Sequence, residues 1–159
     1  MYFSHYSSPL GRIILTATDD GLTALSFEEG KSSLFIPEDF IEKAAPFTDV
    51  CQQLEQYFSN QRTEFTLTLA PKGTVFQKKV WQALQLIKFG QTKSYQWIAQ
   101  KIDNEKAVRA VGAANGANPI ALIVPCHRVI GKNGKLTGYA GGLGLKAKLL
   151  MLEEAHFSV

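Results

Sequence analysis

A change in the spacing of apolar residues near residue 72 limits the chain to a two-part fold. Before that point, GRIILTATDDGLTALSF (11–27) sets β-branched and apolar residues on both sides of DDG, which predicts two strands joined by a tight turn. FTDVCQQLEQYFSNQ (47–61) then predicts a helix, with apolar residues on one face at Val50, Leu54 and Phe58. The first part is therefore expected to combine an antiparallel sheet with a helix.

The spacing becomes helical after RTEFTLTLAP, a strand-like segment, and the turn signal PKGT (71–74). Thr74 and Gln77 match a capping box, and the apolar residues of a long helix follow until FGQ, at Phe76, Val80, Leu84 and Ile87. We therefore expect an α/β domain at residues 1–72 and a mainly helical domain at residues 73–159.

Two shorter helices are expected within the second domain. SYQWIAQKI carries Tyr95, Ile98, Ala99 and Ile102 on one face, and NEKAVRAVGAANG predicts a helix from an Asn104 cap to Gly116. Two short helices joined by a tight turn suggest a helix-turn-helix. The last helix has a surface of small residues around Arg109, namely Ala107, Ala110, Gly112, Ala113 and Ala114. Such a surface suits either close packing against another helix or insertion into a DNA groove with Arg109 projecting.

The balance of acidic and basic residues changes near residue 72, where the spacing of apolar residues also changes. The 159-residue chain has a net charge of +3, but residues 1–71 hold 4 Lys and Arg against 10 Asp and Glu, whereas residues 72–159 hold 13 against 4. A basic half beside an acidic half suggests an anionic partner, and nucleic acid is the commonest one. The alternative is that the lysines only keep this half soluble.

Composition argues against several other classes. No apolar run reaches the roughly 18 residues of a membrane span, and the first residues lack the features of a signal peptide, so a cytoplasmic protein without membrane contact is expected. Cys51 and Cys126 cannot form a disulfide framework, and the three histidines show no metal-ligand spacing with them. Cys51 is expected to be buried as a small apolar residue. Neither a metal nor a cofactor is expected.

The segment IVPCHRVIG (123–131) sets a cysteine between a proline and a histidine. In a strand, Cys126 and His127 would point to opposite faces and could not act together. Cooperation requires a turn after PIALIV, and Pro125 suits the first position of a helical turn, where a nearby imidazole and Arg128 would favour the thiolate. The alternative is an inert thiol at the end of a buried strand.

Five segments occur in the order and spacing of one family: GTVFQKKVWQAL, YQWIAQKI, AVRAVGAANGANPI, PCHRVIGKNGKLTGYAGG and KLLMLE. Together they resemble the O6-alkylguanine-DNA alkyltransferases, also called methylated-DNA–protein-cysteine methyltransferases. The resemblance is specific over residues 73–153, with PCHRV as its hallmark, and looser over the N-terminal half. It implies a ribonuclease-H-like α/β domain, followed by a helix-turn-helix domain that binds double-stranded DNA through the minor groove.

The resemblance implies how the chemistry is divided among four residues. Cys126 resembles the nucleophile that takes an alkyl group from O6 of guanine or O4 of thymine. His127 resembles the base that takes the thiol proton through a water, and Glu153 the carboxylate that orients His127. Asn118 resembles the hinge that joins the helix-turn-helix to the active-site turn. The implied reaction is one irreversible transfer per molecule, by a monomer, without metal or cofactor.

Further residues are implied in DNA binding and in the substrate pocket. Tyr95 resembles the residue that crowds a phosphate, helps to expel the damaged nucleotide and donates a proton near N3 of guanine, and Arg109 the finger that fills the space left behind. The small residues Ala107, Ala110, Gly112 and Ala113 would lie against the DNA. In the pocket, Tyr139 resembles a wall, the backbones of Cys126, Val129 and Ala140 would bind the guanine, and Gly141 would leave room for groups as large as benzyl.

Two positions depart from the family pattern, and two other functions stay open. Ala140 stands where many relatives have serine, and Gln96 replaces a small residue, which puts the phosphate contacts there in doubt. A damage-recognition protein without transfer activity would lack Cys126. A transcription factor would carry polar, base-reading side chains on its recognition helix, whereas this helix is mostly alanine and glycine.

Overall fold

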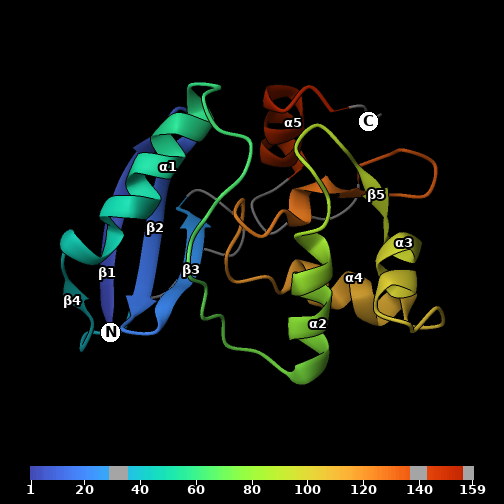
Figure 1. Cartoon of the computed structure of the whole chain (residues 1–159), viewed down its shortest axis with the longest axis horizontal. Helices are drawn as coiled ribbons and strands as arrows, with labels where there is room; N and C mark the ends of the chain where they lie inside the picture. The colour runs from blue at the N-terminus through green and yellow to red at the C-terminus, as the bar shows by residue number, and fades with distance from the viewer. Residues whose placement is uncertain (29–35, 137–142, 156–159) are drawn as a thin grey trace.

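The N-terminal half of the computed structural model is a four-stranded sheet covered by one helix (Figure 1). The structure describes residues 1–28, 36–136 and 143–155. The strands lie in the order β3-β2-β1-β4, where β1 is antiparallel to β2, β2 is antiparallel to β3, and β4 is parallel to β1. Their bounds are Tyr2–Ser8 for β1, Gly11–Thr18 for β2, Gly21–Phe27 for β3 and Ile41–Glu42 for β4. The hairpin expected at DDG is confirmed as β2 and β3, whereas β1 was not expected.

Helix α1 (Thr48–Phe58) follows a short 3-10 turn (Ala45–Phe47) and packs against the sheet. The expected helix is confirmed, but its buried face is centred on Val50, Leu54 and Tyr57, while Phe58 and Cys51 are only half-buried. Cys51 was expected to be buried, and the structure corrects this expectation to partial burial. RTEFTLTLAP forms no regular strand, and only Leu69 makes a bridge, to Leu22 of β3.

The C-terminal half contains four helices among its described residues: α2 (Val75–Leu84), α3 (Tyr95–Lys101), α4 (Val108–Gly116) and α5 (Leu143–Leu152). The capping box at Thr74 and Gln77 is confirmed, because each side chain bonds the other residue's backbone N–H. Helix α2 ends at Leu84, earlier than expected, and Ile87 is buried in the turn that follows. Helix α4 begins at Val108 because residues 104–107 form a separate turn, so the expected Asn104 cap was wrong.

Strand β3 joins the two halves, because its outer edge faces the C-terminal part of the chain (Figure 1). The N–H of Leu25 donates to the carbonyl of Pro119 at 2.9 Å, and the N–H of Ala121 donates back to Leu25 at 3.1 Å. These bonds fix the start of the segment that leads to Cys126. A second connection is the parallel pair of β5 (Lys93–Ser94) and β6 (Val129–Ile130), which sets the start of α3 beside the end of the cysteine turn.

Within the described residues, no helix is both long and apolar enough to cross a membrane.

Trp81 of α2 ties this helix to α4, since its indole N–H donates to the carbonyl of Ala114 at 2.9 Å and its side chain is 2% exposed. This burial places Trp81 in the core. Trp97 is only partly buried, with Lys93 and Lys101 over its ring at 5.2 and 5.1 Å from the centroid. The two tryptophans thus differ: one holds helices together, and the other shields its ring with lysines.

The contact between Gly73 and Trp81 gives a test of this packing. A Cβ at Gly73 would lie 2.4 Å from the Trp81 ring, which its hydrogen bond to Ala114 holds in place. We expect Gly73→Ala to destabilise the protein by about 1–3 kcal/mol, the usual cost of overpacking, measured by urea denaturation. Gly116→Ala is the control, because a Cβ there meets nothing within 4 Å and alanine favours the helix. Equal stability of the two variants would contradict the packing argument.

Candidate functional site

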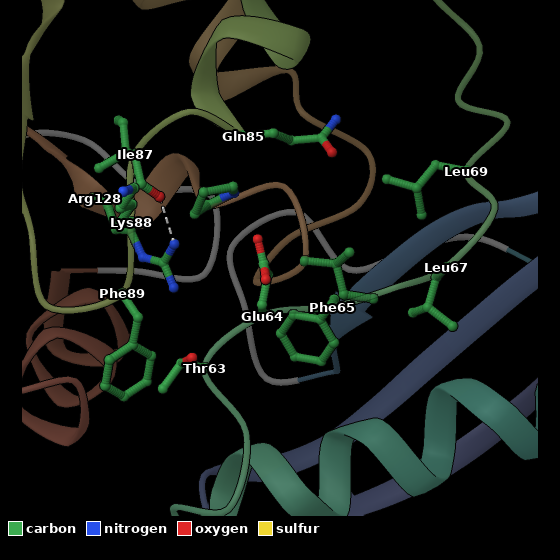
Figure 2. A pocket seen from close by; sticks show the side chains of 12 residues that line it. Thr63, Glu64, Phe65, Leu67, Leu69, Gln85, Ile87, Lys88, Phe89 and Arg128 are labelled. Carbon is green, nitrogen blue, oxygen red and sulfur yellow. Dashed lines mark hydrogen bonds between the residues drawn. The ribbon is translucent and has the colours of Figure 1, made fainter.

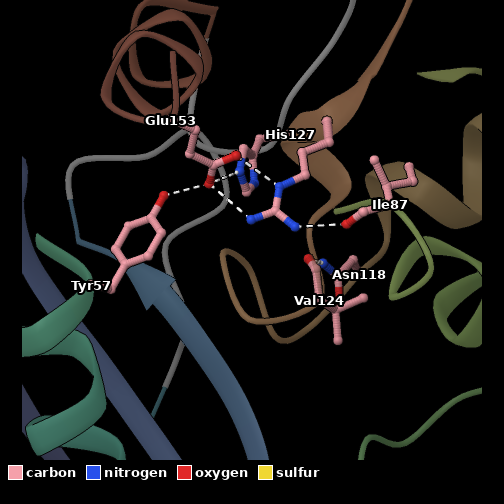
Figure 3. Close-up of polar contacts among 7 residues, drawn as sticks. Tyr57, Ile87, Asn118, Val124, His127 and Glu153 are labelled. Atoms are coloured by element: carbon pink, nitrogen blue, oxygen red, sulfur yellow. Dashed lines mark hydrogen bonds and ion pairs between the residues drawn. The ribbon is translucent and has the colours of Figure 1, made fainter. Parts of the chain in front are cut away.

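The segment that leads to Cys126 is held by the side chain of Asn118. Its Oδ1 accepts from the N–H of Ile120 at 3.1 Å, and its Nδ2 donates to the carbonyl of Val124 at 2.8 Å (Figure 3). These side-chain bonds replace the backbone bonds that a β-strand would make with its neighbour. Residues 119–124 therefore form a turn, in which Leu122 adopts a positive φ of 72°. The alternative of a thiol at a strand end is therefore wrong.

Cys126 opens a short 3-10 helix (Cys126–Arg128) and is 4% exposed. Pro125 precedes this turn as its cap residue, one position earlier than expected. The Cys126 Sγ accepts a hydrogen bond from Asn118 Nδ2 at 3.1 Å, and the carbonyl of Cys126 accepts one from Asn115 Nδ2 at 3.4 Å. The two asparagines near the end of α4 thus hold both the thiol and the backbone of the same residue.

His127 and Glu153 meet within the core, as the resemblance implies. His127 Nε2 lies 2.8 Å from Glu153 Oε2, and both side chains are 0% exposed (Figure 3). Arg128 does not face the thiol: its Nε and Nη2 donate to Oε1 and Oε2 of Glu153 at 2.7 and 3.1 Å, and its Nη1 donates to the carbonyl of Ile87 at 2.7 Å. The expectation that Arg128 favours the thiolate is therefore not supported by its position.

The charges of this cluster determine the tautomer of His127. Burial raises the pKa of Glu153, but the nearby His127 and Arg128 outweigh it and lower that pKa to about 2. The pKa of His127 is lowered, mainly by burial, although Glu153 acts in the opposite direction. A carboxylate can only accept, so Nε2 of the neutral imidazole carries the proton. Nδ1 is left as an acceptor, and it is buried without a hydrogen bond to any residue that the structure describes.

The pKa of the Cys126 thiol is raised by burial, which outweighs the hydrogen bond from Asn118 and the positive charge of Lys146. Lys146 of α5 is itself fully buried, and its Nζ donates to the carbonyl of Val129 at 2.6 Å. Burial lowers the pKa of Lys146 to about 8, while Cys126 acts to raise it. The resting thiol is therefore neutral, and forming the thiolate requires an acceptor such as His127.

The residues expected to contact DNA lie on α3 and α4. Arg109, Ala110 and Ala113 are exposed on one side of α4, whereas Ala107 and Gly112 are half-buried. A Cβ at Gly112 would lie 4.0 Å from the ring of Tyr95, so the first residue of α3 sits directly against α4. Gln96, the departure noted above, donates from Nε2 to the carbonyl of Glu105 at 3.4 Å and so contacts the α3–α4 turn.

Part of the expected substrate pocket can be located. Val129 is fully buried at the end of the cysteine turn, where its carbonyl accepts from Lys146. Tyr139, Ala140 and Gly141 lie outside the described residues. A hollow of about 510 Å³ lies nearby between Glu64 and Phe65 on one side and Ile87 and Arg128 on the other, but Cys126 does not line it (Figure 2). The hollow borders the cysteine turn at Pro125 and Arg128.

A buried thiol next in sequence to a neutral histidine, which is itself paired with an ionised carboxylate, defines the site of a cysteine nucleophile. Comparison with known proteins identifies its family. Residues 1–71 match "6-O-methylguanine DNA methyltransferase, ribonuclease-like domain", and residues 75–155 match "6-O-methylguanine DNA methyltransferase, DNA binding domain". The chain belongs to the 6-O-methylguanine DNA methyltransferase family, and the resemblance inferred from the sequence is confirmed.

Individual relatives are similar in sequence to this chain over nearly its whole length. The methylated-DNA–protein-cysteine methyltransferase of Methanosarcina barkeri is 52% identical over 154 residues, covering 97% of this chain and 98% of the relative. The constitutive enzyme of that name from Bacillus subtilis is 43% identical, covering 98% and 97%. The crystal structure of Mycobacterium tuberculosis OGT in complex with DNA has a TM-score of 0.90 and 44% identity, covering 97% of this chain and 93% of that one.

Four site residues were missed by the sequence reasoning: Tyr57, Asn115, Lys146 and, in its actual role, Arg128. The burial of Lys146 could have been predicted from the sequence. Lys146, Leu149 and Leu150 share one face of α5, and Glu153 continues this face just beyond the end of the helix. Charged residues within such an apolar stripe indicate buried partners. Tyr57 gave no such signal, since a tyrosine at a buried helical position is ordinary.

The role of Lys146 can be tested through the thiol. Because its positive charge favours the thiolate, Lys146→Met should raise the pKa of Cys126. The measurement is the pH dependence of Cys126 alkylation by iodoacetamide in a Cys51→Ala background. Lys148→Met, which removes the same charge from an exposed position of α5, is the control and should leave the midpoint unchanged. Equal midpoints in both variants would contradict this role of Lys146.

Proposed function

We propose that Cys126 is the residue that accepts the alkyl group, with His127 as its base and Glu153 as the group that holds His127. The observation that carries this assignment is the hydrogen-bonded thiol of Cys126 in a turn that also contains a neutral, buried histidine, whose Nδ1 has no hydrogen bond to any described residue. Family membership makes the chain a DNA-repair transferase that reverses damage directly by alkyl transfer to a cysteine, once per molecule.

The proposed reaction is an in-line displacement at the alkyl carbon. The Cys126 proton passes through a water to His127 Nδ1, and the sulfur forms a bond to the alkyl carbon as the bond from that carbon to O6 of guanine breaks. The guanine leaves with the electron pair and takes a proton near N3 from Tyr95. Glu153 stabilises the imidazolium that forms, because its carboxylate is already ionised. The thioether product is stable, and O4-alkylthymine would react in the same way.

DNA is the partner, as the DNA-binding domain of the family and the complex of the relative support. We propose that α3 and α4 act as a helix-turn-helix that enters the minor groove of DNA carrying O6-alkylguanine. The exposed alanines of α4 permit close approach, and Arg109 fills the space of the flipped nucleotide. Tyr95, which lies against Gly112, would crowd the phosphate of that nucleotide.

The remaining assignments complete the proposal. The N-terminal domain, residues 1–72, is ribonuclease-H-like, and residues 73–159 bind DNA and transfer the alkyl group. The protein acts as a monomer in the cytoplasm, where its thiol stays reduced. Backbone groups of Val129 and Ala140 bind the guanine, and Tyr139 and Gly141 bound the alkyl pocket.

Replacement of the nucleophile separates chemistry from binding. Cys126→Ser should slow methyl transfer at least about a thousandfold, because a hydroxyl is far less acidic than a thiol. Transfer is measured with a duplex carrying radiolabelled O6-methylguanine, and lesion binding by gel shift should change little. The matched control is Cys51→Ser, which should retain full transfer because Cys51 lies on α1. Label on the Cys126→Ser protein would overturn the assignment.

Replacement of Arg109 separates nucleotide flipping from chemistry. Arg109→Ala should slow repair of duplex DNA about tenfold, yet change reaction with free O6-benzylguanine less than about twofold, since the free base needs no flipping. Lys106→Ala removes the same charge from an exposed neighbour and is the control for general electrostatic binding. Equal slowing of Arg109→Ala on both substrates would mean that Arg109 supports the fold instead.

A further inference from the structure

Tyr57 connects the N-terminal half to the proton relay. It lies on α1, its side chain is fully buried, and its hydroxyl bonds Glu153 Oε2 at 2.5 Å across 96 residues of sequence (Figure 3). Because Glu153 is ionised, the phenol must donate and the carboxylate must accept. This is a charge-assisted hydrogen bond, roughly twice as strong as one between neutral groups.

The oxygen that Tyr57 contacts is the one that holds His127. Glu153 Oε2 receives Tyr57 at 2.5 Å, His127 Nε2 at 2.8 Å and Arg128 Nη2 at 3.1 Å, while Oε1 receives Arg128 Nε at 2.7 Å. Each donor withdraws part of the negative charge of the carboxylate. Tyr57 therefore acts on the same carboxylate oxygen that accepts the imidazole N–H.

We propose that Tyr57 is a positioning residue for alkyl transfer: its hydroxyl orients Glu153 toward His127 and shares the carboxylate charge, so that the N-terminal half takes part in the proton relay. The inference rests on the proposed roles of Cys126, His127 and Glu153. Tyr57 does not touch the substrate in this scheme and acts through Glu153 alone.

The ring of Tyr57 has a separate structural role, which allows the hydroxyl to be tested by itself. It packs against Phe58, Phe65 and Phe89 with ring centroids 5.1, 5.5 and 6.1 Å away. Phenylalanine keeps these contacts and removes only the donor. Tyr57→Phe therefore changes the charge distribution on Glu153 while it leaves the packing of α1 in place.

The sign of the expected effect follows from the groups that act on His127. Glu153 raises the pKa of His127, whereas burial, Arg128 and Lys146 lower it, and Cys126 is the group that gives up its proton. Without the Tyr57 hydroxyl, more of the Glu153 charge acts on the imidazole, so the pKa of His127 rises. Because protonated His127 cannot accept the thiol proton, the acid limb of the rate profile should move to higher pH.

The experiment is the single-turnover rate of Tyr57→Phe between pH 4.5 and 8, with methylated duplex and with free O6-benzylguanine. We expect the acid limb to move upward by about half to one pH unit, which slows transfer about three- to tenfold at pH values below the limb, equally on both substrates. The titration of the His127 ring nitrogens, followed by NMR on the folded variant, should move by the same amount.

Two further variants distinguish a failure of the proposal for Tyr57 from a failure of the relay. Thr16→Val removes another buried hydroxyl of the N-terminal half, which bonds Thr23 at 2.7 Å, and should not move the acid limb. His127→Gln should abolish the limb, and a limb that persists there would refute the relay itself. If His127→Gln abolishes the limb but Tyr57→Phe leaves both the limb and the His127 titration in place, the relay stands and the proposal for Tyr57 is overturned. A loss of rate without a shift of the limb would likewise overturn the proposal, because the hydroxyl would then not act through the charge of Glu153.

Discussion

The buried carboxylate of Glu153 is the constraint on which the site depends. An ionised carboxylate without solvent must be paired, and removing a partner of a buried ion pair costs about 3–5 kcal/mol. Its donors come from α1, in Tyr57, and from the cysteine turn, in His127 and Arg128, while Glu153 itself follows α5. The pKa of about 2 means that this stabilisation is complete above pH 4.5 and is lost as the pH falls toward 2.

At the Cys126 thiol, burial and the neighbouring groups act on the pKa with the opposite outcome to that at Glu153. Around Glu153 the donors outweigh the effect of burial on the pKa, whereas around Cys126 burial outweighs Asn118 and Lys146, so the thiol is neutral at rest. The thiolate is the form that oxidants and alkylating agents attack, so in the proposed function a neutral thiol protects a residue that can be used only once. The arrangement thus limits reactivity to the moment when His127 can take the proton.

The sequence predicted those features that depend on neighbours along the chain. The DDG turn, the Thr74 capping box and the turn at Pro125 are local, and each is present in the structure. The errors concern side-chain partners that a pattern of apolar residues does not show. Residues 119–124 resemble a strand, but the nearby Asn118 takes their backbone bonds. Arg128 pairs with Glu153, 25 positions away, instead of the thiol. The role of Tyr57 could not be predicted, because it depends on a hydrogen bond to Glu153, which lies 96 positions away in the sequence.

The two tasks of the protein rest on different physics and therefore on different parts of the C-terminal half. The proposed relay lies in a water-excluded interior, where a short hydrogen bond or a single charge changes a pKa, so salt should affect it little. In the proposed function, DNA binding uses the exposed side of α4, where small residues permit contact, while the excess of Lys and Arg in the C-terminal half gives long-range attraction that salt screens. The Asn115 and Asn118 side chains connect the two, because they extend from the end of α4 to the backbone and sulfur of Cys126. A shift of α4 on DNA would therefore reach the thiol through these two amides.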